Sequence, residues 1–257
     1  MLMKKSLIRP CVVGLGYVGL PLFLKLQNKI STVGYDISDT RVKELKFFLD
    51  VNGEFKKKDL VLKKKSLITS DKNLLKFCNF FIVAVPTPIS KKNIPDLSHL
   101  KKSCEIIGKV IVKNSIVFFE STVYPGVTEN FCGRLLEKKS GLKLGVDFFV
   151  GYSPERINPG DKKHSIGKVV KIVSATNNNT LKVAKKIYKK VANKILTNKN
   201  IKEAESAKVI ENIQRDLNIG LMNEVYKVCV NSKINFSNVI KLASTKWNFL
   251  KFDPGLV

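Results

Sequence analysis

The sequence has few of the residues that bind metals or form disulfide frameworks, with only two histidines and five cysteines among 257 residues. The cysteines, at positions 11, 78, 104, 132 and 229, form no Cys-x-x-Cys pair, and His99 and His164 each lack a second ligand at metal-binding spacing. An odd number of isolated cysteines argues against both a disulfide framework and a zinc site. We therefore predict no metal, cysteines that serve in packing, and a reducing compartment, the cytoplasm.

Long hydrophobic runs are also lacking. A membrane-spanning helix needs about 18 or more consecutive apolar residues, and the most apolar stretch, residues 6–26, is interrupted by arginine, lysine, proline and glycine. Lys4 and Lys5 precede apolar residues as in a secretory signal, but the glycines that follow have a spacing that a signal does not require. The sequence predicts neither a membrane span nor a signal peptide.

Acidic residues are scarce relative to basic ones, because 46 Lys and Arg against 21 Asp and Glu leave a net charge of +25. Such a charge is typical of nucleic-acid binding when it is concentrated on one face. Here the lysines are spread along the chain, and the densest runs, 56–58 and 63–65, lack interleaved aromatic residues that would stack on bases. We therefore favour a solvated basic surface over a nucleic-acid interface, with a field that attracts small anions.

Short β-rich runs alternate with helix-length amphipathic segments up to about residue 200, in a chain long enough for one or two domains. The predicted strands are 7–14, 31–36, 66–69, 80–85, 115–120, 148–152, 169–174 and 194–196, and the predicted helices lie near 18–29, 38–48, 97–112, 126–139 and 178–191. Repeated strand–helix–strand order indicates a mostly parallel sheet covered on both faces. We predict an α/β, doubly wound, Rossmann-like domain over residues 1–199.

The pattern changes after residue 200, where apolar residues recur at steps of three and four. This periodicity predicts one amphipathic helix over 202–232, about 45 Å long at 1.5 Å per residue, and a shorter helix follows at 238–244. We assign residues 200–257 to a helical domain and expect the long helix to serve as a dimer surface or a domain connector.

A glycine-rich string, Gly14-Leu15-Gly16-Tyr17-Val18-Gly19, follows the first predicted strand and opens the first helix. In that context the first glycine permits the tight turn, the second lets a pyrophosphate approach the backbone, and the third allows close helix–strand packing. The second predicted strand ends at Asp36, 20 residues after the central glycine, Gly16 (36 − 16 = 20). A carboxylate that binds an adenosine ribose has this spacing.

Asp36 also bears on the choice of cofactor. Its carboxylate would repel a 2′-phosphate, and Ile37 and Ser38 offer no cation beside it. The sequence therefore favours NAD over NADP. Arg41, in the first turn of the next helix, either lies over the adenine or is solvated.

Polar residues follow three further strands. Pro86-Thr87-Pro88, Glu120-Ser121-Thr122 and Ser153-Pro154-Glu155-Arg156 each come where a predicted strand ends. Each alone is compatible with an ordinary turn, but all fall at the sheet edge where ligands bind in open parallel sheets. We expect Thr87 and Thr122 on the nicotinamide side, and Glu155 as a group that moves or orients protons.

Lys208 and Asn212 are four residues apart on the long helix and share a face separate from its apolar stripe. Spacing alone favours a solvated pair. If their face borders the cleft, the two side chains can donate hydrogen bonds to an oxyanion.

Together these strings resemble the UDP-glucose/GDP-mannose dehydrogenase family. The similar segments are GLGYVGLP at 14–21, VPTP at 85–88, ESTVYPG at 120–126, YSPERINPGD at 152–161, ESAKVIENIQRDLNIGLMNE at 205–224 and TKWNFLKFDPGLV at 245–257. The longer strings are most similar to the bacterial branch that oxidises UDP-N-acetylglucosamine or UDP-N-acetylmannosamine for surface polysaccharides.

The resemblance implies a two-step NAD-dependent oxidation of the sugar C6 alcohol to a carboxylate, through a thiohemiacetal on a cysteine. It implies that the glycine turn, Asp36, Thr87 and Thr122 are on the cofactor side. Glu155 would then act in acid/base or water-positioning work, and Lys208 and Asn212 would stabilise the oxyanion. It further implies a homodimer built through the middle helices and a UDP-binding domain after them.

The chain departs from the family at its end. The family pattern continues after the segment resembling FDPGLV into a Gly-Gly-x-Cys stretch that bears the nucleophile, and none of the five cysteines here occupies that place. We expect a chain that binds NAD but does not complete the oxidation alone, with the UDP-binding domain absent and a separate C-terminal chain as one possible complement. A non-catalytic NAD-binding or dimerisation module is the second hypothesis, and nucleic-acid binding the third.

Overall fold

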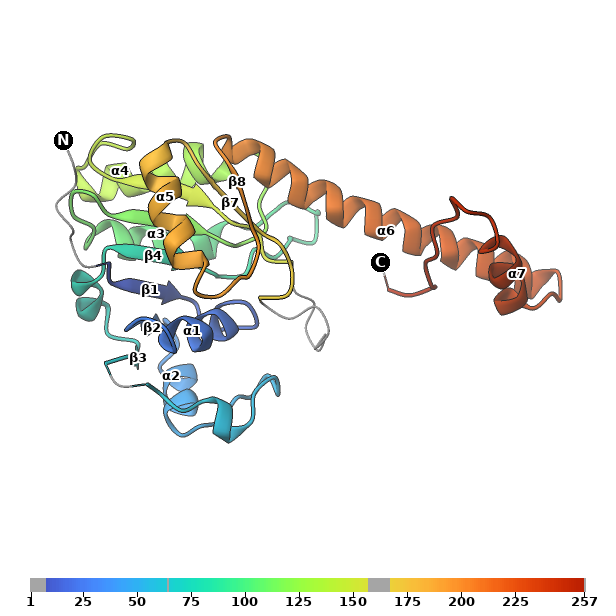
Figure 1. Ribbon diagram of the computed structural model, residues 1–257, viewed down its shortest axis with the longest axis horizontal. Coiled ribbons are helices and arrows are strands. Elements are labelled where there is room, and N and C mark those ends of the chain that lie inside the picture. The colour runs from blue at the N-terminus through green and yellow to red at the C-terminus, as the bar shows by residue number, and fades with distance from the viewer. Residues whose placement is uncertain (1–7, 64, 157–166, 257) are drawn as a thin grey trace. The chain divides into compact units, whose positions relative to one another are not determined.

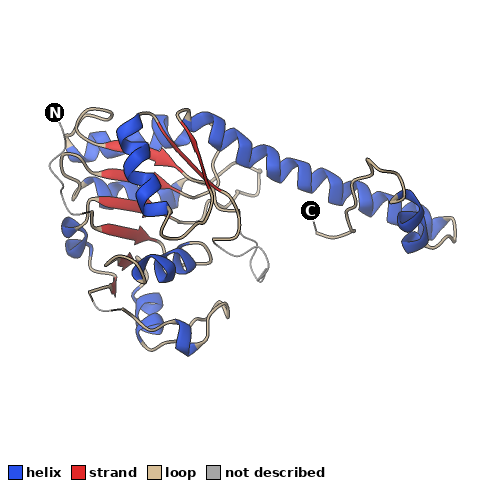
Figure 2. Ribbon diagram, viewed as in Figure 1, coloured by secondary structure: helices blue, strands red, loops and turns tan. Residues whose placement is uncertain are grey.

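The computed structural model describes residues 8–63, 65–156 and 167–256. The chain divides into two compact units, with the boundary between Ser206 and Ala207. The first unit holds the sheet and its covering helices, and the second is helical (Figures 1 and 2).

The first unit is built on one eight-stranded sheet with the strand order β3-β2-β1-β4-β5-β6-β7-β8. Its strands are β1 (Pro10–Val13), β2 (Val33–Tyr35), β3 (Leu67–Thr69), β4 (Phe80–Val83), β5 (Ile116–Phe119), β6 (Phe149–Tyr152), β7 (Lys171–Ala175) and β8 (Ile195–Asn198). All neighbouring pairs are parallel except β6 with β7. The order reverses between β1 and β4, which creates the crevice where open α/β sheets bind ligands.

Helices cover both faces of this sheet. They are α1 (Gly19–Gln27), α2 (Asp39–Lys46), α3 (Ser98–Gly108), α4 (Arg134–Ser140) and α5 (Asn178–Tyr188), with short helical turns η1 (Lys57–Asp59) and η2 (Lys72–Phe77) and a π-helix η3 (Val127–Gly133). Residues of α3, α4 and η3 pack into one apolar cluster, and residues of α1, α2 and α5 into the other. Figure 1 shows α1 and α5 in front of the strands and α3 and α4 behind them.

Alternation along the central strands explains the two clusters. In β1, Cys11 and Val13 face the first cluster while Val12 faces the second, and the apolar residues of β4 and β5 divide in the same way. Successive side chains of a strand point to opposite faces, so strands that are apolar throughout require cover on both sides. The expected doubly wound sheet is confirmed, and each of the eight predicted strands overlaps an observed one.

Two helical expectations differ in detail from the structure. The helix expected near 126–139 begins as the π-helix η3 and continues as α4. The helix expected over 97–112 ends at Gly108, where a Cβ atom would lie 2.7 Å from that of Lys139 on α4. Close packing of α3 on α4 at this glycine accounts for its position.

The second unit contains most of α6 (Ile201–Asn231) and all of α7 (Phe236–Ala243). The Tyr226 and Phe236 rings meet edge to face with centroids 5.5 Å apart, and the Asn223 side chain exchanges two hydrogen bonds with the backbone of Gly255. The expected long helix is confirmed, but much of its apolar stripe is exposed. The exposed members include Ile210, Ile213, Leu217, Leu221 and Val228. No helix among the described residues has the length and hydropathy needed to cross a membrane.

Candidate functional site

The glycine turn joins β1 to α1 at the centre of the sheet. Gly14 has a φ of +91°, and a Cβ there would lie 2.8 Å from the carbonyl oxygen of Ala84, just past β4. A Cβ on Gly19 would overlap the carbonyl oxygen of Gly14. Both positions therefore demand glycine, the first for its backbone conformation and the second for close approach of helix and strand.

Gly16 is different, because a Cβ at this position would meet no atom within 4 Å. The space beside its backbone is open, and the residue lies just before α1, since the N–H of Leu20, four positions later in the first turn of that helix, donates to Gly16 O at 3.0 Å. An open backbone at a helix N-terminus is the geometry that accepts a pyrophosphate. The backbone at Gly16 is thus open to a ligand on its Cβ side.

Asp36 lies at the same turn, as its sequence spacing predicted. Its Oδ2 atom accepts the Leu15 N–H at 2.8 Å, and its Oδ1 atom accepts the Ser38 N–H at 2.9 Å. Ser38 in turn caps α2 by accepting the Arg41 N–H. The carboxylate is therefore held at the carboxyl end of β2, beside the glycines that would face a pyrophosphate.

A pocket of about 260 Å³ opens beside this carboxylate. Gly14, Gly16 and Asp36 line one part of it, and Lys102 and Ser103 of α3 line another. Sequence reasoning did not select the α3 residues, because nothing in their local pattern says that α3 passes the ends of β1 and β2.

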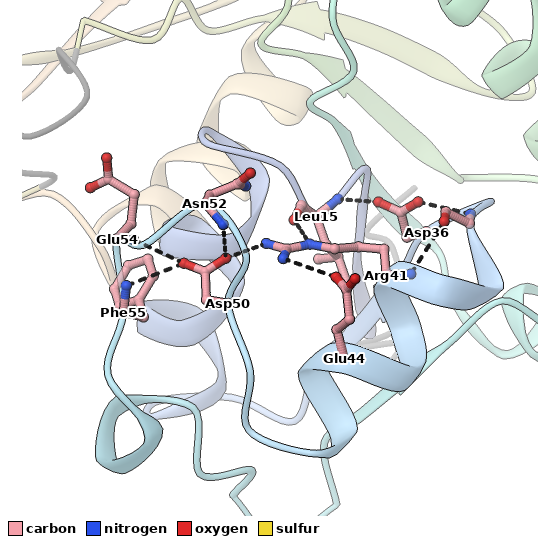
Figure 3. Close-up of polar contacts among 9 residues, drawn as sticks. Leu15, Asp36, Arg41, Glu44, Asp50, Asn52, Glu54 and Phe55 are labelled. Atoms are coloured by element: carbon pink, nitrogen blue, oxygen red, sulfur yellow. Dashed lines mark hydrogen bonds and ion pairs between the residues drawn. The ribbon is translucent and has the colours of Figure 1, made fainter.

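Arg41 is not solvated, one of the two placements that the sequence left open, and the other, over an adenine, stays a prediction. Its side chain is only 11% exposed, its Nε donates to Leu15 O at 3.0 Å, and its terminal nitrogen donates to Asp50 Oδ1 at 2.7 Å. Figure 3 shows the guanidinium between the glycine turn and the loop that carries Asp50. The sequence missed this partner because it lies beyond the helix in an irregular loop.

The loops after β4 and β5 interlock. Thr87 Oγ1 donates to Thr122 O at 2.7 Å, and Ser121 Oγ donates to Val85 O at 2.6 Å. Thr87 is half-buried and Thr122 is exposed. The structure therefore brings together the two threonines that the sequence placed at one sheet edge.

Glu155 belongs to a buried ionic cluster. Lys171 on β7 donates from Nζ to Glu120 Oε2 and to Glu155 Oε2, both at 2.9 Å, and all three side chains are at most 7% exposed. Burial raises the pKa of the Glu120 carboxyl, against the opposing effect of Lys171. Burial would lower the pKa of Lys171, but the two carboxylates raise it above its ordinary value. Sequence analysis missed Lys171, since a lone lysine in a strand gives no sign of its partners.

Glu205, in the first turns of α6, supports the loop after β5. It is fully buried, and its two carboxylate oxygens accept the N–H groups of Gly126 and Thr128 at 2.5 and 2.9 Å. These amides begin η3, so a carboxylate 79 residues away caps that helix.

Lys208 and Asn212 lie on α6 in the second unit and are half-buried, on a face away from the exposed Ile210 and Ile213. The part of the YSPERINPGD string beyond Arg156 lies outside the described residues, as does His164. Within the described ranges no cluster of three or more His, Cys, Asp and Glu could hold a metal ion.

Comparison with known proteins places this geometry in a family. Residues 8–192 match the NAD binding domain of the UDP-glucose/GDP-mannose dehydrogenase family, and residues 202–257 match its central domain. The CapL protein of Staphylococcus aureus is 50% identical over 249 residues, which are 96% of this chain and 58% of CapL. The UDP-N-acetyl-D-glucosamine 6-dehydrogenase of Pseudomonas aeruginosa is 46% identical over 252 residues, which are 97% of this chain and 60% of that enzyme.

Solved structures agree with the sequence relatives. A UDP-N-acetyl-D-mannosamine dehydrogenase from Pyrococcus horikoshii superposes with a TM-score of 0.88 at 33% identity, over 96% of this chain and 60% of that one. The chain thus spans about 60% of the length of the relatives it matches. The glycine turn, the acid at the end of β2 and the family matches lead to one conclusion: the chain belongs to the UDP-glucose/GDP-mannose dehydrogenase family, with the NAD-binding domain of that family at residues 8–192.

Proposed function

We propose that this chain binds NAD as part of an enzyme that oxidises the C6 alcohol of a UDP-N-acetylhexosamine to a uronate. The observation that carries the proposal is the hydrogen bond between Leu15 N–H and Asp36 Oδ2, beside the open backbone of Gly16. This bond supports the proposal because the carboxylate that would bind the ribose lies beside the amides that would face the pyrophosphate. The names of the relatives, which act on UDP-N-acetyl-D-glucosamine or UDP-N-acetyl-D-mannosamine, support the substrate class.

The residues have distinct roles in this proposal. The pyrophosphate is bound by the glycine turn, which consists of Gly14, Leu15, Gly16, Tyr17, Val18 and Gly19. Asp36 binds the ribose, and Arg41 stabilises the turn through its hydrogen bond to Leu15 O. Thr87 and Thr122 lie on the nicotinamide side. NAD, when bound, supplies the hydride acceptor. Glu155 holds or moves a proton near the reacting carbon, and Lys208 and Asn212 stabilise an oxyanion.

The cysteines bear on how much of the reaction this chain performs. All five are buried, between 0% and 2% exposed, and a cysteine nucleophile needs a partially exposed, electropositive setting. We therefore propose that the nucleophile comes from outside these 257 residues, in a longer polypeptide or a separate chain.

Two further features of the proposal concern partners and place. The exposed apolar stripe of α6 supports a homodimer through this helix, and five free cysteines support a reducing compartment, the cytoplasm.

The test has two readouts. Fluorescence titration with NADH measures cofactor binding by the purified chain, and we expect saturable binding. Turnover is then assayed with NAD and UDP-N-acetylglucosamine or UDP-N-acetylmannosamine, with and without the polypeptide encoded immediately downstream. We expect turnover only with that complement. Absence of NADH binding at millimolar concentration contradicts the proposal, while binding without turnover in any combination favours a non-catalytic NAD-binding module.

A further inference from the structure

The Arg41 guanidinium forms hydrogen bonds with the protein on two sides. On one side Nε donates to the Leu15 carbonyl of the glycine turn at 3.0 Å, and on the other a terminal nitrogen donates to Asp50 at 2.7 Å. Glu44 lies 3.7 Å from the remaining terminal nitrogen. Arg41 therefore has its charge offset by carboxylates before any cofactor is present (Figure 3).

Asp50 is held in place to pair with Arg41. Its side chain is fully buried, and besides Arg41 it accepts the N–H groups of Asn52, Glu54 and Phe55 at 3.1 to 3.3 Å. A carboxylate with four donors is held in one orientation. The loop after α2 thus presents a fixed negative charge to Arg41.

Arg41 and Asp36 both form hydrogen bonds with the backbone of Leu15. Asp36 accepts the Leu15 N–H and Arg41 donates to the Leu15 C=O, so the guanidinium and the carboxylate assigned to the ribose are both bound to Leu15. In dinucleotide-binding folds an arginine near this place accommodates the 2′-phosphate of NADP. Here the arginine is present, but its guanidinium forms an ion pair with Asp50.

We propose that Asp50 is a specificity-determining residue, which selects NAD over NADP by holding Arg41 away from a 2′-phosphate. This inference rests on the proposed NAD-binding function. Selection then has two parts. Asp36 repels the 2′-phosphate directly, and Asp50 withholds the cation that would compensate for that repulsion.

The experiment compares the dissociation constants of NADH and NADPH, measured by the fluorescence of the bound reduced nicotinamide on the full chain. Replacing Asp50 by Asn releases one charge-assisted bond of Arg41, and we expect the ratio of the NADPH constant to the NADH constant to fall about tenfold. A merely structural role of Asp50 would weaken both cofactors equally and leave the ratio unchanged. An unchanged ratio in folded Asp50→Asn overturns the inference.

Three matched variants separate the mechanism from general charge effects. Asp59→Asn removes the same charge from an exposed carboxylate in η1, and Asp50→Glu keeps the charge, so both should leave the ratio within about twofold of the original. Arg41→Gln/Asp50→Asn removes the released cation, and the gain should disappear. If it persists, another cation, such as Lys102 in the pocket beside Asp36, carries the effect and the inference is wrong.

Folding is checked by circular dichroism and thermal unfolding. If Asp50→Asn does not fold, Asp50→Ser takes its place, because the hydroxyl fits the space of the carboxylate and can still accept one loop amide. The same fall in ratio is expected, and an unchanged ratio overturns the inference. If the unmodified chain binds neither cofactor, the proposed function fails; if it binds NADH but the ratio does not respond to Asp50, only this inference fails.

Discussion

The carboxylate of Glu205 lies 2.5 Å from the amide nitrogen of Gly126, across 79 residues of sequence. The same side chain accepts the Thr128 N–H and is fully buried. The start of α6 is thereby fixed to the loop that carries Thr122, so this bond links the position of a predicted cofactor contact to the beginning of the long helix.

Replacement of Glu205 by Gln should destabilise the first unit by about 2 kcal/mol, because a buried amide N–H then faces an amide donor in place of a carboxylate oxygen. Urea denaturation followed by circular dichroism measures the loss. Glu203→Gln, an exposed glutamate on the same helix, is the control and should change stability by less than about 0.5 kcal/mol. Equal effects of the two substitutions would show that the cap is unimportant.

Replacement of Lys171 by Met should cost about 3 to 5 kcal/mol at pH 7, because it leaves Glu120 and Glu155 buried without their counter-charge. Lys182→Met, at an exposed position on α5, is the matched control and should be close to neutral.

The same variant should also change the pH dependence of stability. Burial already raises the pKa of Glu120, and loss of Lys171 raises it further. A carboxyl whose folded-state pKa lies above its unfolded value takes up a proton more readily when folded, so folding is favoured as the pH falls. The deficit of Lys171→Met relative to the original chain should therefore shrink between pH 7 and pH 5 in thermal unfolding. A deficit that stays constant over this range would contradict the role assigned to the cluster.

Glu137 should have the opposite effect to Glu120 on the pH dependence of stability, because it should stabilise the folded state less as the pH falls. Hydrogen bonds from Arg134 and from the Leu144 N–H lower the pKa of this carboxyl. A carboxyl with a lowered folded-state pKa stabilises the protein above its unfolded pKa, about 4.3, and this contribution is lost as the pH falls through the folded value. Glu137→Gln should be less stable at neutral pH, and its melting temperature should fall less steeply on acidification. Glu129→Gln in η3 serves as the control. If the melting temperatures of Glu137→Gln and of the original chain fall equally steeply on acidification, this assignment is refuted.

Gly19→Ala should unfold the turn rather than merely weaken cofactor binding. A Cβ there overlaps the carbonyl oxygen of Gly14, which cannot move without displacing β1 or α1, and we expect a loss of about 3 kcal/mol. Gly53→Ala, where φ is +72° but no atom lies within 4 Å, tests strain without overlap and should cost less. A Gly19→Ala chain as stable as the original would contradict the close approach of α1 to the turn.

The fold could be predicted because its signals are local. Apolar strands such as those ending at Val13 and Val83 alternate with amphipathic helices, and this order is enough to indicate a doubly wound sheet. The spacing from Gly16 to Asp36 is also local to one βαβ unit, and the structure places the two at one turn.

The partners of the charged residues could not be predicted in the same way. Lys171 reaches Glu120 and Glu155 across the antiparallel pair of β6 and β7, and Glu205 reaches a loop 79 residues earlier. No periodicity records such contacts, because they depend on which strand ends become neighbours. Arg41 shows the consequence, since its sequence position indicated a cofactor or solvent while its partner is a buried aspartate in an irregular loop.

The central claim is that the glycine turn holds the pyrophosphate of a dinucleotide, and Gly16→Val tests it most directly. Because a Cβ at Gly16 meets no protein atom within 4 Å, the substitution should leave the melting temperature nearly unchanged while its side chain fills the space of the pyrophosphate. In NADH titrations the dissociation constant should rise at least about 100-fold. Tight NADH binding by folded Gly16→Val would contradict the account.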